Sequence, residues 1–304
     1  MKDFEIGRTL GKGRFATVYL SRERKSGTIV VLKIIYKAVL AELGAEKSLR
    51  SEIEINAHLN HKNLIRIYGY FSDEERIYLV LEYAMNGDLL NEVQLCRLDE
   101  RQAAGYIFQI ACGLQHMHKH YVIHRDIKLD NIYLNAEGEI KIGDFGWAVH
   151  KPKNLEGQIV GTKSYLAPEM LLGQNYDYRV DIWSLGVVAY AMIVGELPFF
   201  GDNDAELEQN ILNAKPKIPG FVSKPCKDLL VNLLKKNPEE RITLEELFSH
   251  PWITEMNSPP SLKELCIQYI RETNDLEGYD LSVLDPELIE ELDFDAVHHR
   301  FLSE

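Results

Sequence analysis

The chain has 304 residues, 45% of them hydrophobic, which is enough for a large folded core. Its net charge of −13 argues against general nucleic-acid binding, because that activity needs a basic face. The 4 cysteines lie far apart in no metal-ligand spacing, so we expect thiols in a reducing, intracellular compartment.

The N-terminal part of the chain is predicted to be a small antiparallel sheet. Residues 4–81 alternate apolar and polar side chains, apart from one helix expected at 46–59. Glycines at 11 and 13 lie between the first two strand-like runs and let the backbone approach phosphate oxygens without an intervening Cβ. The residues expected to contact a nucleotide at this turn are Leu10, Gly11, Lys12, Gly13 and Val18.

A lysine and a glutamate are expected to form an ion pair beside this turn. Lys33 ends the apolar run 29–32, from which its ammonium would reach the α- and β-phosphates. Glu52 follows 19 residues later, on the expected helix, and its carboxylate would hold the ammonium in place. The position of that helix then becomes a control point.

One ordered set of polar residues carries the strongest chemical signal. His124-Arg125-Asp126 is followed by Lys128 and Asn131, and Asp144-Phe145-Gly146 begins 13 residues after Asn131. Asp126 would accept the proton of a substrate hydroxyl, and Lys128 would stabilise charge on the γ-phosphoryl group. Asn131 and Asp144 would hold Mg²⁺, so the expected cofactors are ATP and Mg²⁺.

The rest of the chain reads as mainly helical. Between 89 and 250 helical periodicity dominates, and the apolar run 182–194 predicts a buried core helix that is too short to span a bilayer. Arg241 sits where it would pair with Glu169 of Ala167-Pro168-Glu169. Asp181 is expected to fix the backbone of the His-Arg-Asp segment.

These motifs, in this order, resemble the eukaryotic protein kinases over residues 4–253. The resemblance implies an α+β, bilobal fold and an ATP-dependent protein kinase. A small antiparallel-sheet N-lobe (4–81) with one key helix would precede a hinge (82–84) and a larger, mainly helical C-lobe (85–253).

The hinge would hold the adenine of ATP, because ligands often bind between two lobes. Backbone groups of Glu82 and Ala84 would pair with the adenine, and Leu81 would line the back of its pocket.

Residues 254–304 are expected to form an acidic, partly helical extension, with helices at 261–272 and 285–301. From residue 255 onward, 13 acidic residues stand against 3 lysines and arginines. Either this tail docks on a basic partner or it is a solvated extension, and charge runs are usually solvated.

Finer details resemble the Aurora kinases, the mitotic serine/threonine kinases of the spindle and centromere. Trp147 directly follows Asp144-Phe145-Gly146, Tyr68-Gly69-Tyr70-Phe71 follows the helix, and Gly161-Thr162 precedes the Ala-Pro-Glu segment. Asn56, one turn after Glu52, matches a polar glutamine of the Aurora kinases where most kinases have an apolar residue packed against this phenylalanine. A polar group there leaves the active arrangement less self-sufficient.

The Aurora resemblance also implies how substrates are recognised. Thr162 would contact Asp126 and Lys128, which goes with serine or threonine acceptors. Asp88 and Asp130 match acidic positions that favour arginine or lysine before the acceptor. A third such position holds Ala191 here, which weakens the expected basic preference.

One departure concerns the activation segment, the stretch that runs from Asp144-Phe145-Gly146 to Ala167-Pro168-Glu169. Aurora kinases carry a phosphorylated threonine 4 residues before the threonine that matches Thr162, and Gln158 stands there instead. No Ser, Thr or Tyr occurs in 147–160, and Ser51 replaces an arginine that grips the phosphate in relatives. Arg125 would then lack its anion, and we expect Glu156 to partner it.

We therefore expect activation without segment phosphorylation, through a protein of the inner-centromere type bound to the N-lobe near Tyr68, Tyr70 and the helix. A constitutively active enzyme is the competing interpretation. The expected role lies in chromosome segregation, in the nucleus or cytoplasm and at the spindle or centromere. The alternatives are an AMP-activated-type or Polo-like kinase with a regulatory tail, and an inactive scaffold.

Overall fold

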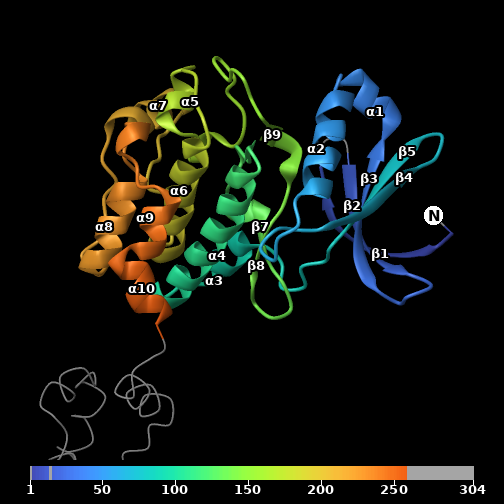
Figure 1. Ribbon diagram of the computed structural model, residues 1–304, viewed down its shortest axis with the longest axis horizontal. Helices are drawn as coiled ribbons and strands as arrows, with labels where there is room; N and C mark the ends of the chain where they lie inside the picture. Colours follow the sequence, from blue (N-terminus) through green and yellow to red (C-terminus); the bar gives the residue numbers. More distant parts are fainter. Residues whose placement is uncertain (1, 14–15, 259–304) are drawn as a thin grey trace, which may run out of the picture. The chain divides into compact units, whose positions relative to one another are not determined.

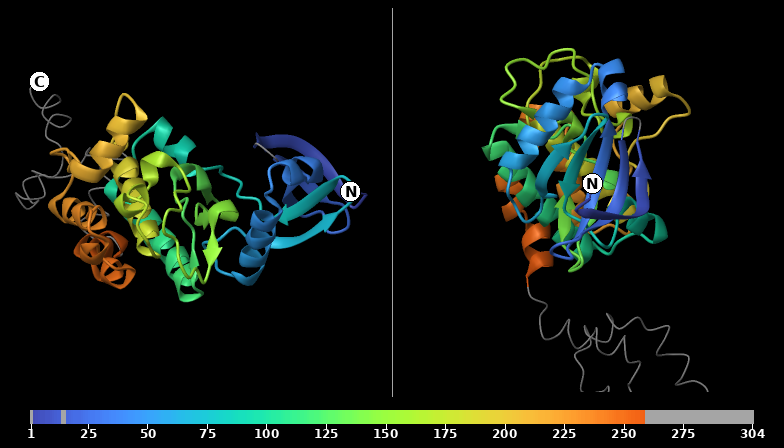
Figure 2. Two further views of the ribbon diagram at one scale, coloured as in Figure 1. Left: turned by 90° about the horizontal axis from the view of Figure 1, so that it is seen from above. Right: turned by 90° about the vertical axis from the view of Figure 1, so that its right-hand side faces the viewer.

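The computed structural model describes residues 2–13 and 16–258. The tip of the glycine turn and the helices expected at 261–272 and 285–301 lie outside the described residues. The described residues up to 257 form one compact unit, in which a sheet lies on one side of the hinge region and a group of helices on the other (Figures 1 and 2). The α+β fold class predicted from the sequence is confirmed.

The sheet has the strand order β1-β2-β3-β5-β4, and all its neighbouring strands run antiparallel (Figure 1). Lys33 pairs with Val18 across β2 and β3, so it lies in the middle of its strand and not at the end. The strands are β1 (Phe4–Lys12), β2 (Ala16–Glu23), β3 (Ile29–Tyr36), β4 (Ile67–Ser72) and β5 (Arg76–Leu81).

Two helices follow β3: α1 (Lys37–Glu42) and α2 (Glu46–His58). Helix α2 is anchored at both ends to different cores. Leu49 near its start packs with residues of the sheet, whereas Ile55 near its end joins the core of the helical part. The N-cap residue Ala45 provides no side-chain hydrogen bond, so the first turn of α2 has no capping side chain.

The helical part is built around α4 (Glu100–Lys119) and α6 (Arg179–Val194). Asp99 caps α4 by accepting from the Gln102 amide, and α6 is buried nearly all round, as its apolar run predicts. The remaining helices are α3 (Leu89–Leu95), α5 (Pro168–Leu171), α7 (Asp204–Asn213), α8 (Lys224–Leu233), α9 (Leu244–Ser249) and α10 (Pro251–Asn257).

Short hairpins and 3₁₀ turns carry the polar motifs between the two parts. Strand β6 (Val122–Ile123) pairs with β9 (Val149–His150), and β7 (Ile132–Leu134) pairs with β8 (Ile140–Ile142). The turns are η1 (Leu129–Asn131), η2 (Phe145–Trp147), η3 (Lys163–Tyr165) and η4 (Pro238–Glu240). Within the described residues, no helix combines the length and apolarity needed to cross a bilayer.

Candidate active site

A cavity of about 650 Å³ lies where the sheet meets the helical part. This volume is typical of sites for small molecules. Its lining includes most residues expected to bind a nucleotide: Leu10, Gly11, Gly13, Val18, Lys33, Glu52, Leu81, Glu82 and Ala84. Lys12 is the exception: it is exposed at the end of β1 and does not line the cavity.

The expected ion pair is formed inside this cavity. Lys33 Nζ lies 2.6 Å from Glu52 Oε1 and 3.9 Å from Asp144 Oδ1. Burial disfavours the charged lysine, but the carboxylates of Glu52 and Asp144 outweigh that effect and raise the pKa of Lys33. Its ammonium is therefore held charged and in place at the depth where phosphates would bind.

The hinge leaves backbone groups open toward the cavity. The Glu82 amide donates to the Arg66 carbonyl at 2.9 Å, so it is occupied, and its side chain pairs with Lys141 at 2.6 Å. Among the described residues, the Ala84 amide has no hydrogen-bond acceptor. The Glu82 carbonyl and the Ala84 amide are thus the groups suited to an adenine edge.

Asp126 lies at the centre of a dense polar cluster and is 4% exposed. Its Oδ1 accepts from the Thr162 amide at 3.0 Å and from the Thr162 hydroxyl at 2.9 Å. Its Oδ2 accepts from Asn131 Nδ2 at 2.9 Å and lies 3.4 Å from Lys128 Nζ, which also donates to the Thr162 hydroxyl at 2.8 Å. The structure therefore brings together the three residues expected to act on the acceptor, Asp126, Lys128 and Thr162, with Asn131, which was expected to hold Mg²⁺.

Gly161 makes the approach of Thr162 possible. Its φ is +102°, and a Cβ there would meet the Arg125 carbonyl oxygen at 2.5 Å. Only glycine fits this backbone without displacing residues 124–131, which we call the catalytic segment. The chain thus reaches the position from which Thr162 contacts Asp126.

A fully buried carboxylate holds the catalytic segment from behind, as expected. Asp181 accepts from the amides of His124 and Arg125 at 2.9 and 2.8 Å, and His118 Nε2 lies 2.9 Å from it. Burial would raise the pKa of Asp181, but the hydrogen bond and charge of His118 and the contacts of His124 lower it below the ordinary value. The residue therefore stays ionised and supports the segment without doing chemistry.

Asn131 and Asp144 fit a magnesium site. The Asn131 amide nitrogen donates to the Asp126 carbonyl and carboxylate, which leaves its Oδ1 available as a ligand. Asp144 has a left-handed backbone, with φ 58°, and its side chain is 46% exposed toward the cavity. Hard oxygen donors suit Mg²⁺, which often keeps only one or two protein ligands and takes the rest from phosphates and water.

Two acidic residues lie near the mouth of this site. Asp88 caps α3 by accepting from the Asn91 amide at 2.9 Å, and Asp130 is exposed in η1. Burial, followed by the charges of Asp144, Asp88 and Asp130, raises the pKa of Tyr133 to about 12. The region around Tyr133 is therefore negatively charged.

The expected pairing of Arg125 with Glu156 is wrong. The Arg125 guanidinium forms no ion pair with any carboxylate of the described residues and donates to Gln158 Oε1 at 3.0 Å. A turn decides this: Leu155 is buried, the Gln158 amide donates to the Leu155 carbonyl, and Glu156 is left exposed.

The sequence also gave no sign of Tyr176, whose hydroxyl accepts from Arg125 Nη1 at 3.2 Å. The two residues are 51 positions apart, and a tyrosine carries no local pattern that marks such a contact. The one signal in the sequence was Arg125 itself, a cation without its expected phosphate partner, which therefore needed other contacts.

Asn56 and Phe145, which we expect to pack together, both line the cavity. Asn56 is 7% exposed, and its Oδ1 has no hydrogen-bond partner in the described part of the chain. An unpaired buried amide oxygen costs about 1–3 kcal/mol. This cost falls on the active position of α2.

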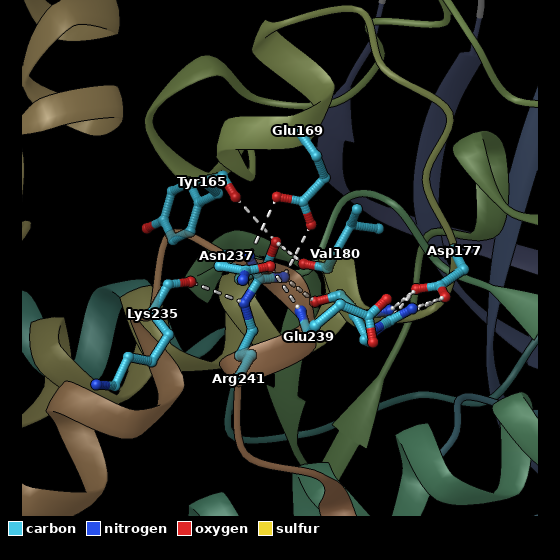
Figure 3. A network of polar contacts seen from close by, with 10 residues as sticks. Tyr165, Glu169, Asp177, Val180, Lys235, Asn237, Glu239 and Arg241 are labelled. Carbon is cyan, nitrogen blue, oxygen red and sulfur yellow. Dashed lines mark hydrogen bonds and ion pairs between the residues drawn. The ribbon is translucent and has the colours of Figure 1, made fainter.

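The end of the activation segment is tied into the helical part by a second buried ion pair (Figure 3). Arg241 makes a two-point contact with Glu169, at 2.9 and 3.1 Å, and also donates to the Lys235 carbonyl at 3.2 Å. The Arg179 carbonyl accepts from Arg241 at 2.6 Å, and the Arg179 side chain pairs with Asp177 and Glu239. This network confirms the pairing expected between Arg241 and Glu169.

Comparison with known proteins agrees with this geometry. The sequence profile described as "Protein kinase domain" matches residues 4–253. The chain is 48% identical over 252 residues to the Aurora kinase of Schizosaccharomyces pombe, covering 82% of this chain and 71% of that protein. It is 43% identical over 265 residues to Aurora kinase B of Danio rerio, covering 87% and 82%.

Aurora kinase A-B of Xenopus laevis is a third relative, 46% identical over 265 residues, covering 87% of this chain and 65% of that protein. The chain spans just under two thirds of the length of this relative and of Aurora kinase A-A from the same organism, for which the share is 62%.

Proposed function

Because the chain belongs to the protein kinase family, and within it to the Aurora kinases, we propose that it transfers the γ-phosphoryl group of ATP to serine and threonine hydroxyls of proteins. The observation that carries this proposal is the mutual contact of Asp126, Lys128 and Thr162. The ion pair between Lys33 and Glu52 is formed in the same structure. Phosphoryl transfer needs little covalent help from a protein, so positioned charges of this kind supply most of the catalysis.

In the proposed reaction, Asp126 accepts the hydrogen of the substrate hydroxyl and points its oxygen at the γ-phosphorus. Lys128 lies 3.4 Å from the same carboxylate and neutralises charge on the phosphoryl oxygens. Lys33, fixed by Glu52, holds the α- and β-phosphates. The bond from the hydroxyl oxygen to phosphorus forms as the bond to the β-phosphate oxygen breaks, with ADP as the leaving group.

Asn131 and Asp144 would hold Mg²⁺ against the phosphates, where the ion supplies charge neutralisation. The Asn131 oxygen is positioned for this by the bonds from its amide nitrogen to Asp126. The residue that orients the hydroxyl and the residue that would hold the ion are thus linked directly.

We propose protein substrates with arginine or lysine before the acceptor residue. Asp88 and Asp130 lie beside the site, and after burial and Asp144 their charges also contribute to the raised pKa of Tyr133. Carboxylates in such positions pair well with guanidinium groups. A role in chromosome segregation at the spindle or centromere follows from the family and is part of the proposal.

Activation is proposed to come from a partner protein on the N-lobe. Strand β4 is an edge strand of the sheet, and its Tyr68 and Tyr70 are 53% and 64% exposed on one face. Exposed aromatic side chains on a sheet edge are suited to binding another chain. A partner there would also lie near α2, whose first turn has no capping side chain and whose Asn56 Oδ1 has no hydrogen-bond partner among the residues that the structure describes.

A peptide-array assay with Mg-ATP tests the proposed function. We expect label on serine and threonine peptides with preceding arginines, little label on tyrosine peptides, and a higher rate with an activator peptide of the inner-centromere class. A rate that the activator leaves unchanged would indicate a constitutive enzyme. Phosphatase treatment should leave the rate unchanged, since 147–160 contains no Ser, Thr or Tyr; a large loss would contradict phosphorylation-independent activation.

A further inference from the structure

The Arg125 guanidinium is surrounded by neutral groups. Its Nε donates to the Trp147 carbonyl at 2.8 Å, and its Nη1 donates to Gln158 Oε1 at 3.0 Å and to the Tyr176 hydroxyl at 3.2 Å. Arg125 is 8% exposed and has no carboxylate partner among the residues that the structure describes. Its positive charge is therefore stabilised by dipoles alone.

Tyr176 closes this arrangement into a ring of hydrogen bonds. Its hydroxyl donates to the Gln158 carbonyl at 3.0 Å while it accepts from Arg125, and the residue is 7% exposed. One phenol thus contacts both the backbone of Gln158 and the cation that holds the Gln158 side chain. Three separate parts of the chain meet here: the start of the activation segment at Trp147, its middle at Gln158, and the stretch before α6 at Tyr176.

Neighbouring contacts fasten the same stretch of chain. The Leu155 amide donates to Asn175 Oδ1 at 2.9 Å, and the Gly157 amide donates to the Gly173 carbonyl at 3.0 Å. Together with the contact between Gln158 and Tyr176, these bonds join residues 155–158 to residues 173–176. The middle of the activation segment is therefore attached along its length to residues 173–176.

The position of this attachment matters for the reactive cluster. Thr162 follows Gln158 by four residues, across Gly161, and contacts Asp126 directly. Arg125 is the residue next to Asp126, and its own amide is held by Asp181. A segment released from Arg125 would free both the chain that carries Thr162 and the cation beside the catalytic carboxylate.

We propose that Gln158 and Tyr176, acting through Arg125, are positioning residues that hold Thr162 against Asp126 with no phosphate group. This proposal rests on the proposed kinase function. In it, the contacts of Gln158 and Tyr176 with Arg125 order the activation segment without phosphorylation. Hydrogen bonds to a charged group are stronger than those between neutral groups, so the contacts of Gln158 and Tyr176 with Arg125 are suited to hold the segment.

Steady-state kinetics of Gln158→Ala and Tyr176→Phe test this role, with Gln174→Ala and Tyr178→Phe as matched controls. Gln174 is exposed, Tyr178 is partly exposed, and their side-chain amide and hydroxyl have no hydrogen-bond partner among the described residues. We expect each test variant to lower kcat/KM for a peptide about tenfold, with KM for ATP unchanged, and the controls to match the wild type.

Gln158→Glu is the rescue variant, because its carboxylate presents the same acceptor to Arg125 with added negative charge. We expect it to keep at least wild-type kcat/KM. A loss in Gln158→Glu as large as in Gln158→Ala, or test variants no different from their controls, would overturn the proposal.

Amide hydrogen exchange over 156–161 provides a readout that does not depend on catalysis. We expect faster exchange there in Gln158→Ala and Tyr176→Phe, with exchange in α4 and α6 unchanged. Unchanged exchange in 156–161 would contradict the proposal even if activity fell. Should the wild-type chain transfer no phosphate, the proposed function would fail while this measurement still decided whether the attachment exists.

Discussion

The two halves of the active site differ in how completely they are held. Asp126 in the helical half is fixed by Thr162, Asn131 and the backbone that Asp181 supports, and it rests on one continuous hydrophobic core. The half supplied by the sheet depends on α2, and among the described residues the sheet has two small core clusters, one on each face.

This difference indicates which half can be regulated. Folding of the helical core leaves Asp126 little freedom, because its neighbours are already paired. Glu52 reaches Lys33 only when α2 is in place, and in that position the Asn56 oxygen is buried without a partner in the described part of the chain. A partner protein therefore has most to gain by stabilising α2, and least by acting on the catalytic segment.

The largest effect is expected in the helical half. Asp126→Asn removes the group that accepts the hydroxyl proton and should lower kcat by about 10²- to 10⁴-fold. Nucleotide binding should persist, because Lys33 and Glu52 are untouched; fluorescence titration with ATP checks this. Asp202→Asn is the matched control, since Asp202 is exposed with no side-chain partner in the described residues. Near-wild-type turnover in Asp126→Asn would refute the assignment of the base.

Removing the support behind the catalytic segment should cost stability as well as activity. Asp181→Asn breaks a fully buried charged contact, and we expect a loss of about 3 kcal/mol in the free energy of unfolding. Urea titrations at neutral pH measure it. An unchanged unfolding free energy would show that the carboxylate does not hold this half.

The pH dependence of unfolding gives a second test of Asp181. Because its pKa is lowered in the folded state, its contribution is fully present above its ordinary value of 3.8 and is lost as the pH falls toward the folded-state pKa. The wild type should therefore lose stability on acidification below 3.8 more steeply than Asp181→Asn. Parallel curves for the two proteins would contradict the lowered pKa.

A smaller effect, of opposite sign, is expected in the sheet half. Asn56→Leu removes the unpaired oxygen, so it should raise the free energy of unfolding by about 1–2 kcal/mol and increase activity without an activator. The stimulation by an activator should shrink accordingly. Asn60→Leu, at an exposed position just past the end of α2, is the control for an added leucine. Basal activity that falls in Asn56→Leu would show that the polar group supports the active state.

The smallest effect concerns Glu156, which was expected to pair with Arg125 and does not contact it. Glu156→Gln should change kcat/KM less than about twofold, because Glu156 is exposed and does not contact Arg125, and exposed charges contribute little. Peptide kinetics at low and moderate salt measure this. A tenfold loss of kcat/KM would indicate that Glu156 does pair with Arg125.

The sequence predicts most of this site because its key residues sit at short, fixed separations. Asp126, Lys128 and Asn131 lie on one tight segment, so their spacing alone brings them together. Lys33 and Glu52 could be paired because a strand and a helix present them in a known order. Even so, the sequence placed Lys33 at the end of its strand, whereas sheet pairing puts it in the middle.

What the sequence missed depends on turns and on distant contacts. Whether Glu156 or Gln158 faces Arg125 is decided by a turn around buried Leu155, which no periodicity reveals. The contact of Tyr176 with Arg125 spans 51 positions and has no pattern of its own. Among the described residues the Asn56 oxygen has no partner, and this can be seen only when the positions of all its neighbours are known.

The most direct test of the account is transfer of labelled γ-phosphate from Mg-ATP to a basic serine peptide, measured with and without the activator peptide. We predict transfer by the wild type, a higher rate with the activator, and a rate about 10²- to 10⁴-fold lower in Asp126→Asn. A chain that binds ATP with Lys33 engaged but labels no peptide, even with the activator present, would contradict it.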